Sequence, residues 1–498
     1  MTRSAGVLLH PTSLPGPHGL GEIGPASRHF LDWLERAGFT VWQMLPLGPV
    51  EEDGSPYATG SAFARNPLLI SLDDLVTAGW LLEAEVPHFG GDPHWVDFSR
   101  ALTVRAPAIA AASERAAASV DLEAFVAANP WLDDWSTYAA ISELYGARWT
   151  RWPERLRHRD PDALADVKDR LAARIASHQA AQWLFADQWS NLRKDASSRG
   201  ISLWGDVPFF VSGDGCDTWA HRELFRMDPD GHVDVVSGVP PDAFAEEGQL
   251  WGHPLYDEAT HAATGHTWWI DRIGATLGLV DRIRLDHFRG IAAYWEVSAG
   301  APNAMSGHWI PGPGQPLLDH LRAAFGALPF LAEDLGVITP DVAALRDQNR
   351  LPGMAILQFA FGQPGWDGDH LPHHHRKDQV VYPGTHDNDT VRGWYDTAPE
   401  ATRDHVRRYL SVSGADIAGD LTRAALRSVA DGCVIQMQDL LRLPGSCRMN
   451  VPGRATGNWG WRMLAEALDP GLAGYLNEQI RLAGRTGHDL VSAPEGAP

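Results

Sequence analysis

The chain has 498 residues, of which 44% are hydrophobic, so it is long enough to bury a large core and is not intrinsically disordered. Its formal net charge of −22 disfavours nucleic acid and anionic membrane surfaces as partners. The three cysteines form no CxxC pair, the N-terminal segment has only a short apolar run, and no apolar stretch is long enough to span a bilayer. We therefore expect a cytoplasmic protein without a disulfide framework, a signal peptide or a membrane span.

Short apolar segments recur along the chain, and most of them end in a polar or Gly/Pro-rich turn, as strands do. Eight such segments predict strands, at 6–10, 41–49, 201–211, 280–288, 328–336, 354–362, 380–388 and 433–441. Helical patterns lie between many of them, for example at 25–38, which starts at Pro25 and stops at Gly38, and at 339–349, where Thr339 is the expected N-cap. Eight strands that alternate with helices predict an α/β fold, a single (β/α)8 TIM barrel over residues 1–498, with helical and loop insertions between strands.

Four connections are too long for one simple helix. Residues 65–200 are Ala-rich and predict a helical insertion between the second and third strands, with one long helix over 160–199. Residues 212–278 predict an insertion of substrate loops between the third and fourth strands, in which "FAEEGQLWGHPLY" (244–256) is expected to be a loop. A further loop is expected at "PGPGQP" (311–316), and helices with turns are expected over 389–431.

Three acidic residues follow apolar runs at the carboxyl ends of predicted strands, where barrel enzymes gather their reactive groups: Asp286, Glu333 and Asp387. Arg284 and Asp286 share one face of a strand, and the guanidinium favours an ionised Asp286 that is suited to be a nucleophile. Glu333 has apolar neighbours, and burial should raise its pKa and keep it protonated as a general acid. Two carboxyl groups in contrasting environments suit glycoside chemistry, although buried ion pairs between strands are the alternative interpretation of each acid.

The composition includes 21 tryptophans. Their flat apolar faces suit stacking on a sugar or a nucleobase, and the acidity of the chain makes nucleic acid the weaker choice. A large core packed with tryptophan is the alternative explanation.

Three segments, "RIRLDHFRG", "AEDLG" and "GTHDNDT", resemble the catalytic segments of the 4-α-glucanotransferases called amylomaltases or disproportionating enzymes, which form glycoside hydrolase family 77 and are relatives of the α-amylases. Other resembling segments follow one another in the family's order along nearly the whole chain. They are "HPTSLPGPHGLGEIG" (10–24), "QMLPLGP" (43–49), "SPY" (55–57), "SAFARNPLLI" (61–70), "GDVPFFV" (205–211), "GQLWGHPLY" (248–256) and "RMNVPG" (448–453).

The resemblance implies roles for the matching positions. Asp286 resembles the nucleophile, Glu333 the acid/base, and Asp387 the third carboxylate, which stabilises the transition state and grips the sugar. It further implies that the following residues bind substrate: Arg284, His386, Asp206, Tyr57, Gln249, Trp251 and Asn388. Two positions depart from the family pattern. Leu285 replaces an Ile, which is a packing change on the opposite face of the strand, and His253 replaces an Asn in the segment expected to close over the site.

The implied reaction transfers α-1,4-glucan segments from a maltooligosaccharide, or from a starch- or glycogen-derived glucan, to the 4-hydroxyl of another glucan or of glucose, with no cofactor and no metal. The alternatives are an α-1,4-glucan hydrolase on the same barrel and a non-catalytic glucan-binding protein. A metal-dependent barrel hydrolase would need several His residues at strand ends, and His10, His287 and His386 show no ligand pattern. The four His residues of "HLPHHHRKD" (370–378) favour a solvated loop over a metal site.

Overall fold

A computed structural model of the chain describes residues 2–241, 246–361 and 368–486. Its central feature is a parallel sheet with the strand order β10-β11-β12-β1-β2-β3-β6-β9. Each of the predicted strand segments overlaps one of these strands: β1 (Ser4–Leu8), β2 (Val41–Gln43), β3 (Ser202–Val207), β6 (Arg282–Leu285), β9 (Phe330–Ala332), β10 (Gly353–Ile356), β11 (Gln379–Tyr382) and β12 (Gly432–Gln436). The backbone N–H of Ala332 donates to the carbonyl of Pro352 at 2.9 Å, which holds the end strands β9 and β10 next to each other, so that the sheet forms a nearly closed barrel. The predicted barrel is therefore confirmed.

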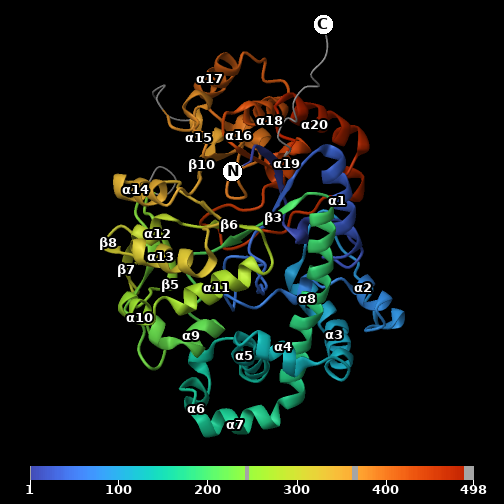
Figure 1. Cartoon of the computed structure of the whole chain (residues 1–498), viewed down its shortest axis with the longest axis vertical. Coiled ribbons are helices and arrows are strands. Elements are labelled where there is room, and N and C mark those ends of the chain that lie inside the picture. Colours follow the sequence, from blue (N-terminus) through green and yellow to red (C-terminus); the bar gives the residue numbers. More distant parts are fainter. Residues whose placement is uncertain (1, 242–245, 362–367, 487–498) are drawn as a thin grey trace.

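The barrel strands are buried because helices cover their outer faces (Figure 1). Helix α1 begins at Pro25 and ends at Ala37, followed by Gly38 with a φ of 78°, as the sequence predicted. The helices that follow the later barrel strands are α11 (Thr267–Leu277), α12 (Arg289–Ala292), α13 (Gly314–Phe325), α14 (Pro340–Gln348), α15 (Leu357–Ala360), α16 (Val391–Thr397), α17 (Glu400–Leu410), α18 (Ile417–Arg427), α19 (Met437–Leu440) and α20 (Pro470–Leu482). The expectation of helices and turns over 389–431 is confirmed by α16, α17 and α18.

A helical region lies between β2 and β3. It contains α2 (Leu72–Thr77), α3 (Phe98–Ala117), α4 (Leu122–Ala128), α5 (Trp131–Tyr145), α6 (Glu154–Arg157), α7 (Pro161–Arg170) and α8 (Ala172–Ser198). The single helix expected over 160–199 was wrong, because the chain bends at Leu171, where no Gly or Pro signals a break. Helix α8 then runs back to the barrel (Figure 1). No helix of the described residues combines the length and the apolar character needed to cross a membrane.

A second, antiparallel sheet with the order β5-β4-β7-β8 flanks the barrel. It contains β4 (Val235–Val239), β5 (Gln249–Pro254), β7 (Ala293–Ser298) and β8 (His308–Pro311), beside the short helices α9 (Cys216–Ala220) and α10 (Glu258–Ala263). The loop expected at 244–256 was therefore wrong over 249–254, because this segment pairs with β4. Residues 242–245 lie outside the described residues. The loop expected at 311–316 was also wrong in part, since Pro311 ends β8 and Gly314 already begins α13.

Candidate active site

Arg284 lies at the centre of a charged group at the carboxyl end of the barrel. Its Nη1 is 2.7 Å from Asp206 Oδ2 and 2.8 Å from Asp286 Oδ1. Strand β3 positions Asp206 and strand β6 positions Arg284, in neighbouring parallel register. The side chains of Asp206 and Arg284 are buried, whereas that of Asp286 is 28% exposed. Asp286 is thus an ion-paired carboxylate that still faces the solvent-accessible end of the barrel.

Glu333 follows β9 and lies against the segment that carries Asp286. The backbone N–H of His287 donates to Glu333 Oε2 at 2.8 Å, and the backbone N–H of Leu335 donates to Oε1 at 3.0 Å. Burial raises the pKa of Glu333 to about 8; the positive charge of Arg284 opposes this increase and the negative charge of Asp286 adds to it. The direction of this shift agrees with the expectation from the apolar neighbours of Glu333, and it favours the protonated carboxyl group.

Asp387 follows β11, and its pKa is lowered, in contrast to that of Glu333. Burial by itself would raise the pKa of Asp387, but His386 and a hydrogen bond from Asn450 hold it well below its usual range. Asn450 Nδ2 donates to Asp387 Oδ1 at 2.7 Å, and Arg448 Nη2 donates to the Asp387 carbonyl at 2.9 Å. Neither Asn450 nor Arg448 was assigned a role from sequence. The available signal was that "RMNVPG" follows β12, whose carboxyl end opens on the same edge of the barrel.

Tyr57 connects two parts of the site. Its hydroxyl donates to Asp206 Oδ2 at 2.9 Å and lies 2.8 Å from His386 Nε2. The rings of Tyr57 and His386 stack at a centroid distance of 5.4 Å. His386 Nε2 is in turn 3.3 Å from Asp387 Oδ2, so a continuous series of polar contacts runs from Asp286 through Asp206 to Asp387.

The predicted substrate-binding residues of β5 lie beside the segment that carries Asp286. Trp251 meets the ring of His287 edge-on at a centroid distance of 4.8 Å, and its Nε1 donates to Gln249 Oε1 at 3.3 Å. His253 stacks on Phe210 at 6.3 Å, and burial lowers its pKa to about 4, so it is a neutral side chain.

Asn388 is another predicted substrate-binding residue, and its side-chain oxygen is already engaged in hydrogen bonds within its own turn. Its Oδ1 accepts hydrogen bonds from the backbone N–H of Thr385 at 2.9 Å and from the Thr385 hydroxyl at 3.0 Å. Its contact with a sugar therefore stays a prediction.

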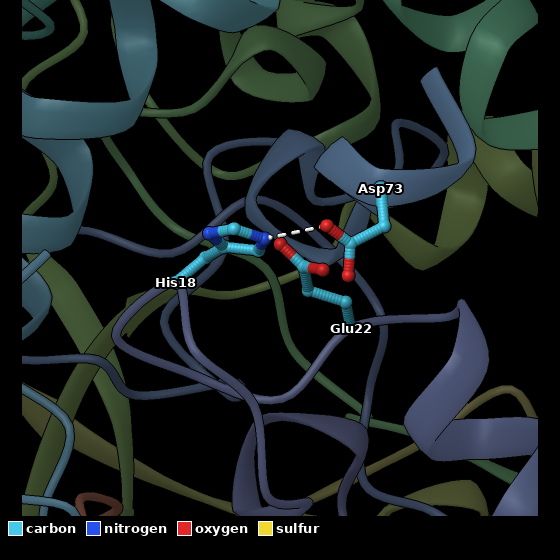
Figure 2. A group of neighbouring side chains, drawn as sticks. All are labelled: His18, Glu22 and Asp73. Atoms are coloured by element: carbon cyan, nitrogen blue, oxygen red, sulfur yellow. Dashed lines mark hydrogen bonds and ion pairs between the residues drawn. The ribbon is translucent and has the colours of Figure 1, made fainter. Parts of the chain in front are cut away.

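Among the described residues, one group has side chains of the types that bind metal ions, with their ligand atoms within 4.8 Å of one another: His18, Glu22 and Asp73 (Figure 2). His18 Nε2 lies 3.0 Å from Asp73 Oδ1. Glu22 Oε1, however, is 2.5 Å from Nη1 of the fully buried Arg105, so a guanidinium already supplies the positive charge. We describe this group as an ion network that joins the 10–24 segment to α2 and α3.

The His residues at 370–375 do not form a comparable group within the described residues. His375 Nδ1 lies 2.7 Å from the Ser428 hydroxyl, and its Nε2 lies 2.9 Å from the His370 carbonyl. His373 Nδ1 lies 2.7 Å from the Tyr409 hydroxyl. These side chains are therefore engaged in hydrogen bonds within the protein, and the expected solvated loop was wrong for the buried His375.

Comparison with known proteins gives consistent results. The glycoside hydrolase family 77 model, described as 4-alpha-glucanotransferase, matches residues 9–467. A chloroplastic/amyloplastic 4-alpha-glucanotransferase of Oryza sativa is 47% identical over 476 residues, covering 93% of this chain and 80% of the relative. The 4-alpha-glucanotransferase of Thermus thermophilus is 43% identical and covers 94% of this chain and 96% of the relative. The amylomaltase of Streptococcus agalactiae, solved in complex with acarbose, superposes with a TM-score of 0.94 at 33% identity, covering 97% of this chain and 99% of that structure.

Proposed function

The chain belongs to glycoside hydrolase family 77 and is a 4-alpha-glucanotransferase that acts on α-glucans, and from this premise we propose that it works by a retaining double displacement at Asp286 and Glu333. The observation that carries the proposal is the contrast between these two acids. Asp286 is ion-paired with Arg284. Glu333 accepts a hydrogen bond from the backbone N–H of His287, the residue after Asp286, and burial raises the pKa of Glu333 to about 8.

In the first step, an oxygen of Asp286 attacks the anomeric carbon of the donor glucan. The bond from that carbon to the glycosidic oxygen breaks as Glu333 gives its proton to this oxygen, and the shortened glucan leaves with a free hydroxyl group. The product is a glucosyl ester of Asp286. Asp387 stays ionised, and we assign to it and to Asp206, His386 and Tyr57 the binding of the sugar ring at the point of cleavage.

In the second step, Glu333 is a carboxylate and takes the proton from the 4-hydroxyl of an acceptor. The acceptor oxygen attacks the anomeric carbon, the ester bond breaks, and Asp286 is released as a carboxylate. Two inversions restore the α configuration. The acceptors that we propose are maltooligosaccharides and glucose. Trp251 and Gln249 on β5 are proposed to hold the acceptor and limit the entry of water, which would turn transfer into hydrolysis.

Incubation of the protein with maltotriose tests the proposed substrates. Transfer between maltotriose molecules yields free glucose and a series of longer maltodextrins, while the total number of reducing ends stays nearly constant. Chromatography of the products together with a reducing-end assay measures both quantities. A steady rise in reducing ends without longer products would contradict the proposed acceptors, because it would mean that water takes the glucosyl group.

The pH dependence of kcat/KM should follow Glu333. Because the first step needs a protonated Glu333, kcat/KM with maltotriose is expected to fall as the pH rises through about 8. Initial rates measured across this range give the profile. Release of fluoride from α-maltosyl fluoride in a single turnover is the control, since fluoride leaves without a proton donor and its release should not show this fall. A maltotriose profile that stays level well above pH 8 would remove Glu333 from the role of acid.

A further inference from the structure

Arg289 belongs to the same "RIRLDHFRG" segment as Asp286 but takes no part in the steps above. It begins α12 and is buried, with 6% of the residue exposed. Its Nη1 donates to the Val337 carbonyl at 2.7 Å and to the Thr339 hydroxyl at 3.0 Å. Both acceptors lie in residues 333–339, the loop that connects β9 to α14 and carries Glu333. Arg289 thus ties the far end of the Glu333 loop to the segment of Asp286.

The near end of the same loop is tied by the backbone. The N–H of Phe288 donates to the Glu333 carbonyl at 3.1 Å, and the N–H of His287 donates to the Glu333 carboxyl group at 2.8 Å. The direction in which the Glu333 carboxyl group points is therefore set by the position of the 333–339 loop relative to residues 286–289. The backbone contacts hold the beginning of the 333–339 loop against residues 286–289, and the Arg289 contacts hold its end against the same residues.

The guanidinium of Arg289 is itself held in place by the second sheet. Its Cζ lies 3.6 Å from the ring centroid of Trp309 on β8, a short cation–π contact. The turn after β8 lies very close to α12. A Cβ atom added at Gly312 would be only 2.2 Å from the Gly290 carbonyl oxygen, so only glycine fits there. With the guanidinium of Arg289 held against Trp309, its Nη1 points toward the 333–339 loop. A Lys side chain has neither this plane nor the fixed donor geometry.

We propose that Arg289 is a positioning residue for the acid/base, acting by fixing the 333–339 loop so that Glu333 meets the glycosidic oxygen. This proposal rests on the proposed role of Glu333. It assigns to Arg289 an effect on proton transfer only, with no contact to the substrate.

The test compares two donors that differ in their need for an acid. In Arg289→Met, kcat with maltotriose is expected to fall by about 10²-fold with little change in KM, because a small displacement of a catalytic group has an effect of this size. Release of fluoride from α-maltosyl fluoride in a single turnover should stay close to the wild-type rate. Arg289→Lys should recover only part of the loss. Equal losses with both donors, or wild-type kcat with maltotriose, would overturn the proposal.

Arg282→Met is the matched control. Arg282 lies on the same segment and also stacks on a tryptophan, with its Cζ 5.4 Å from the ring of Trp204, but its hydrogen bond goes to the Phe330 carbonyl in β9. This variant should keep wild-type kcat with maltotriose. Thr339→Val removes one acceptor of Arg289. The loss in kcat should be smaller than in Arg289→Met and should again appear with maltotriose but not with α-maltosyl fluoride; a loss equal for both donors would contradict the proposal.

Glu333→Gln separates this proposal from the proposed function. If Glu333→Gln keeps its turnover of maltotriose, the assignment of the acid fails and the role of Arg289 fails with it. If Glu333→Gln is inactive while Arg289→Met behaves as wild type, only the role of Arg289 is lost.

Discussion

Asp286→Asn is expected to lower kcat with maltotriose by more than about 10⁴-fold, since loss of a covalent nucleophile removes the step on which all later steps depend. An amide is a poor nucleophile and cannot form the ester. The fold should survive, because Arg284 keeps its ion pair with Asp206 at 2.7 Å and is not left as an unpaired buried charge. The rate of glucose release and the Tm measure the two effects.

Asp281→Asn is the matched control for this variant. Asp281 directly precedes the "RIRLDHFRG" segment, at the amino end of β6, and its Oδ1 is 3.0 Å from Arg193 Nη2. It faces away from the carboxyl end of the barrel, so its loss should leave kcat unchanged. Turnover by Asp286→Asn close to that of Asp281→Asn would mean that another group carries the glucosyl residue.

Glu333→Gln is expected to lower kcat with maltotriose by about 10²- to 10⁴-fold, the usual contribution of a general acid–base group. Gln has the size of Glu but cannot give a proton to the glycosidic oxygen. With α-maltosyl fluoride the first step should proceed, because fluoride is a good leaving group. The second step still lacks its base, so the ester of Asp286 should accumulate. Single-turnover fluoride release measures the first step, and the steady-state rate of fluoride release, which requires breakdown of the ester, measures the second.

Glu258→Gln controls for the general effect of changing a partly buried glutamate. Burial raises the pKa of Glu258 to about 7, and the Tyr294 hydroxyl donates to its Oε1 at 3.0 Å, but it lies on α10 outside the group around Arg284. Its kcat should equal that of the wild type. A loss in Glu258→Gln as large as in Glu333→Gln would show that burial of a glutamate, and not proton transfer, limits the rate.

The barrel could be predicted because each of its strands carries its own apolar segment and each pairs with a neighbour in the order of the chain. The strand β5 could not, because it forms by pairing with β4 and its sequence "QLWGHP" contains both Gly and Pro. The break between α7 and α8 at Leu171 was missed because neither Gly nor Pro stands there to signal a turn.

The acids of the candidate site could be predicted from the sequence because each of them follows an apolar strand segment. The residues that bind to these acids could not be predicted. Asn450 lies 63 residues from Asp387 and Val337 lies 48 residues from Arg289, and no local pattern relates such positions. The contrast in charge state between Asp387 and Glu333 likewise depends on His386, Asn450 and depth of burial, which only the fold determines.

Mass spectrometry of the trapped glucosyl ester would measure the nucleophile itself. After incubation of Glu333→Gln with α-maltosyl fluoride, the intact protein should gain the mass of one maltosyl group, and proteolysis should place that group on the peptide that contains Asp286. A maltosyl group on Asp387, on Asp206 or on any other residue, or release of fluoride with inversion and no gain in mass, would contradict the double displacement at Asp286.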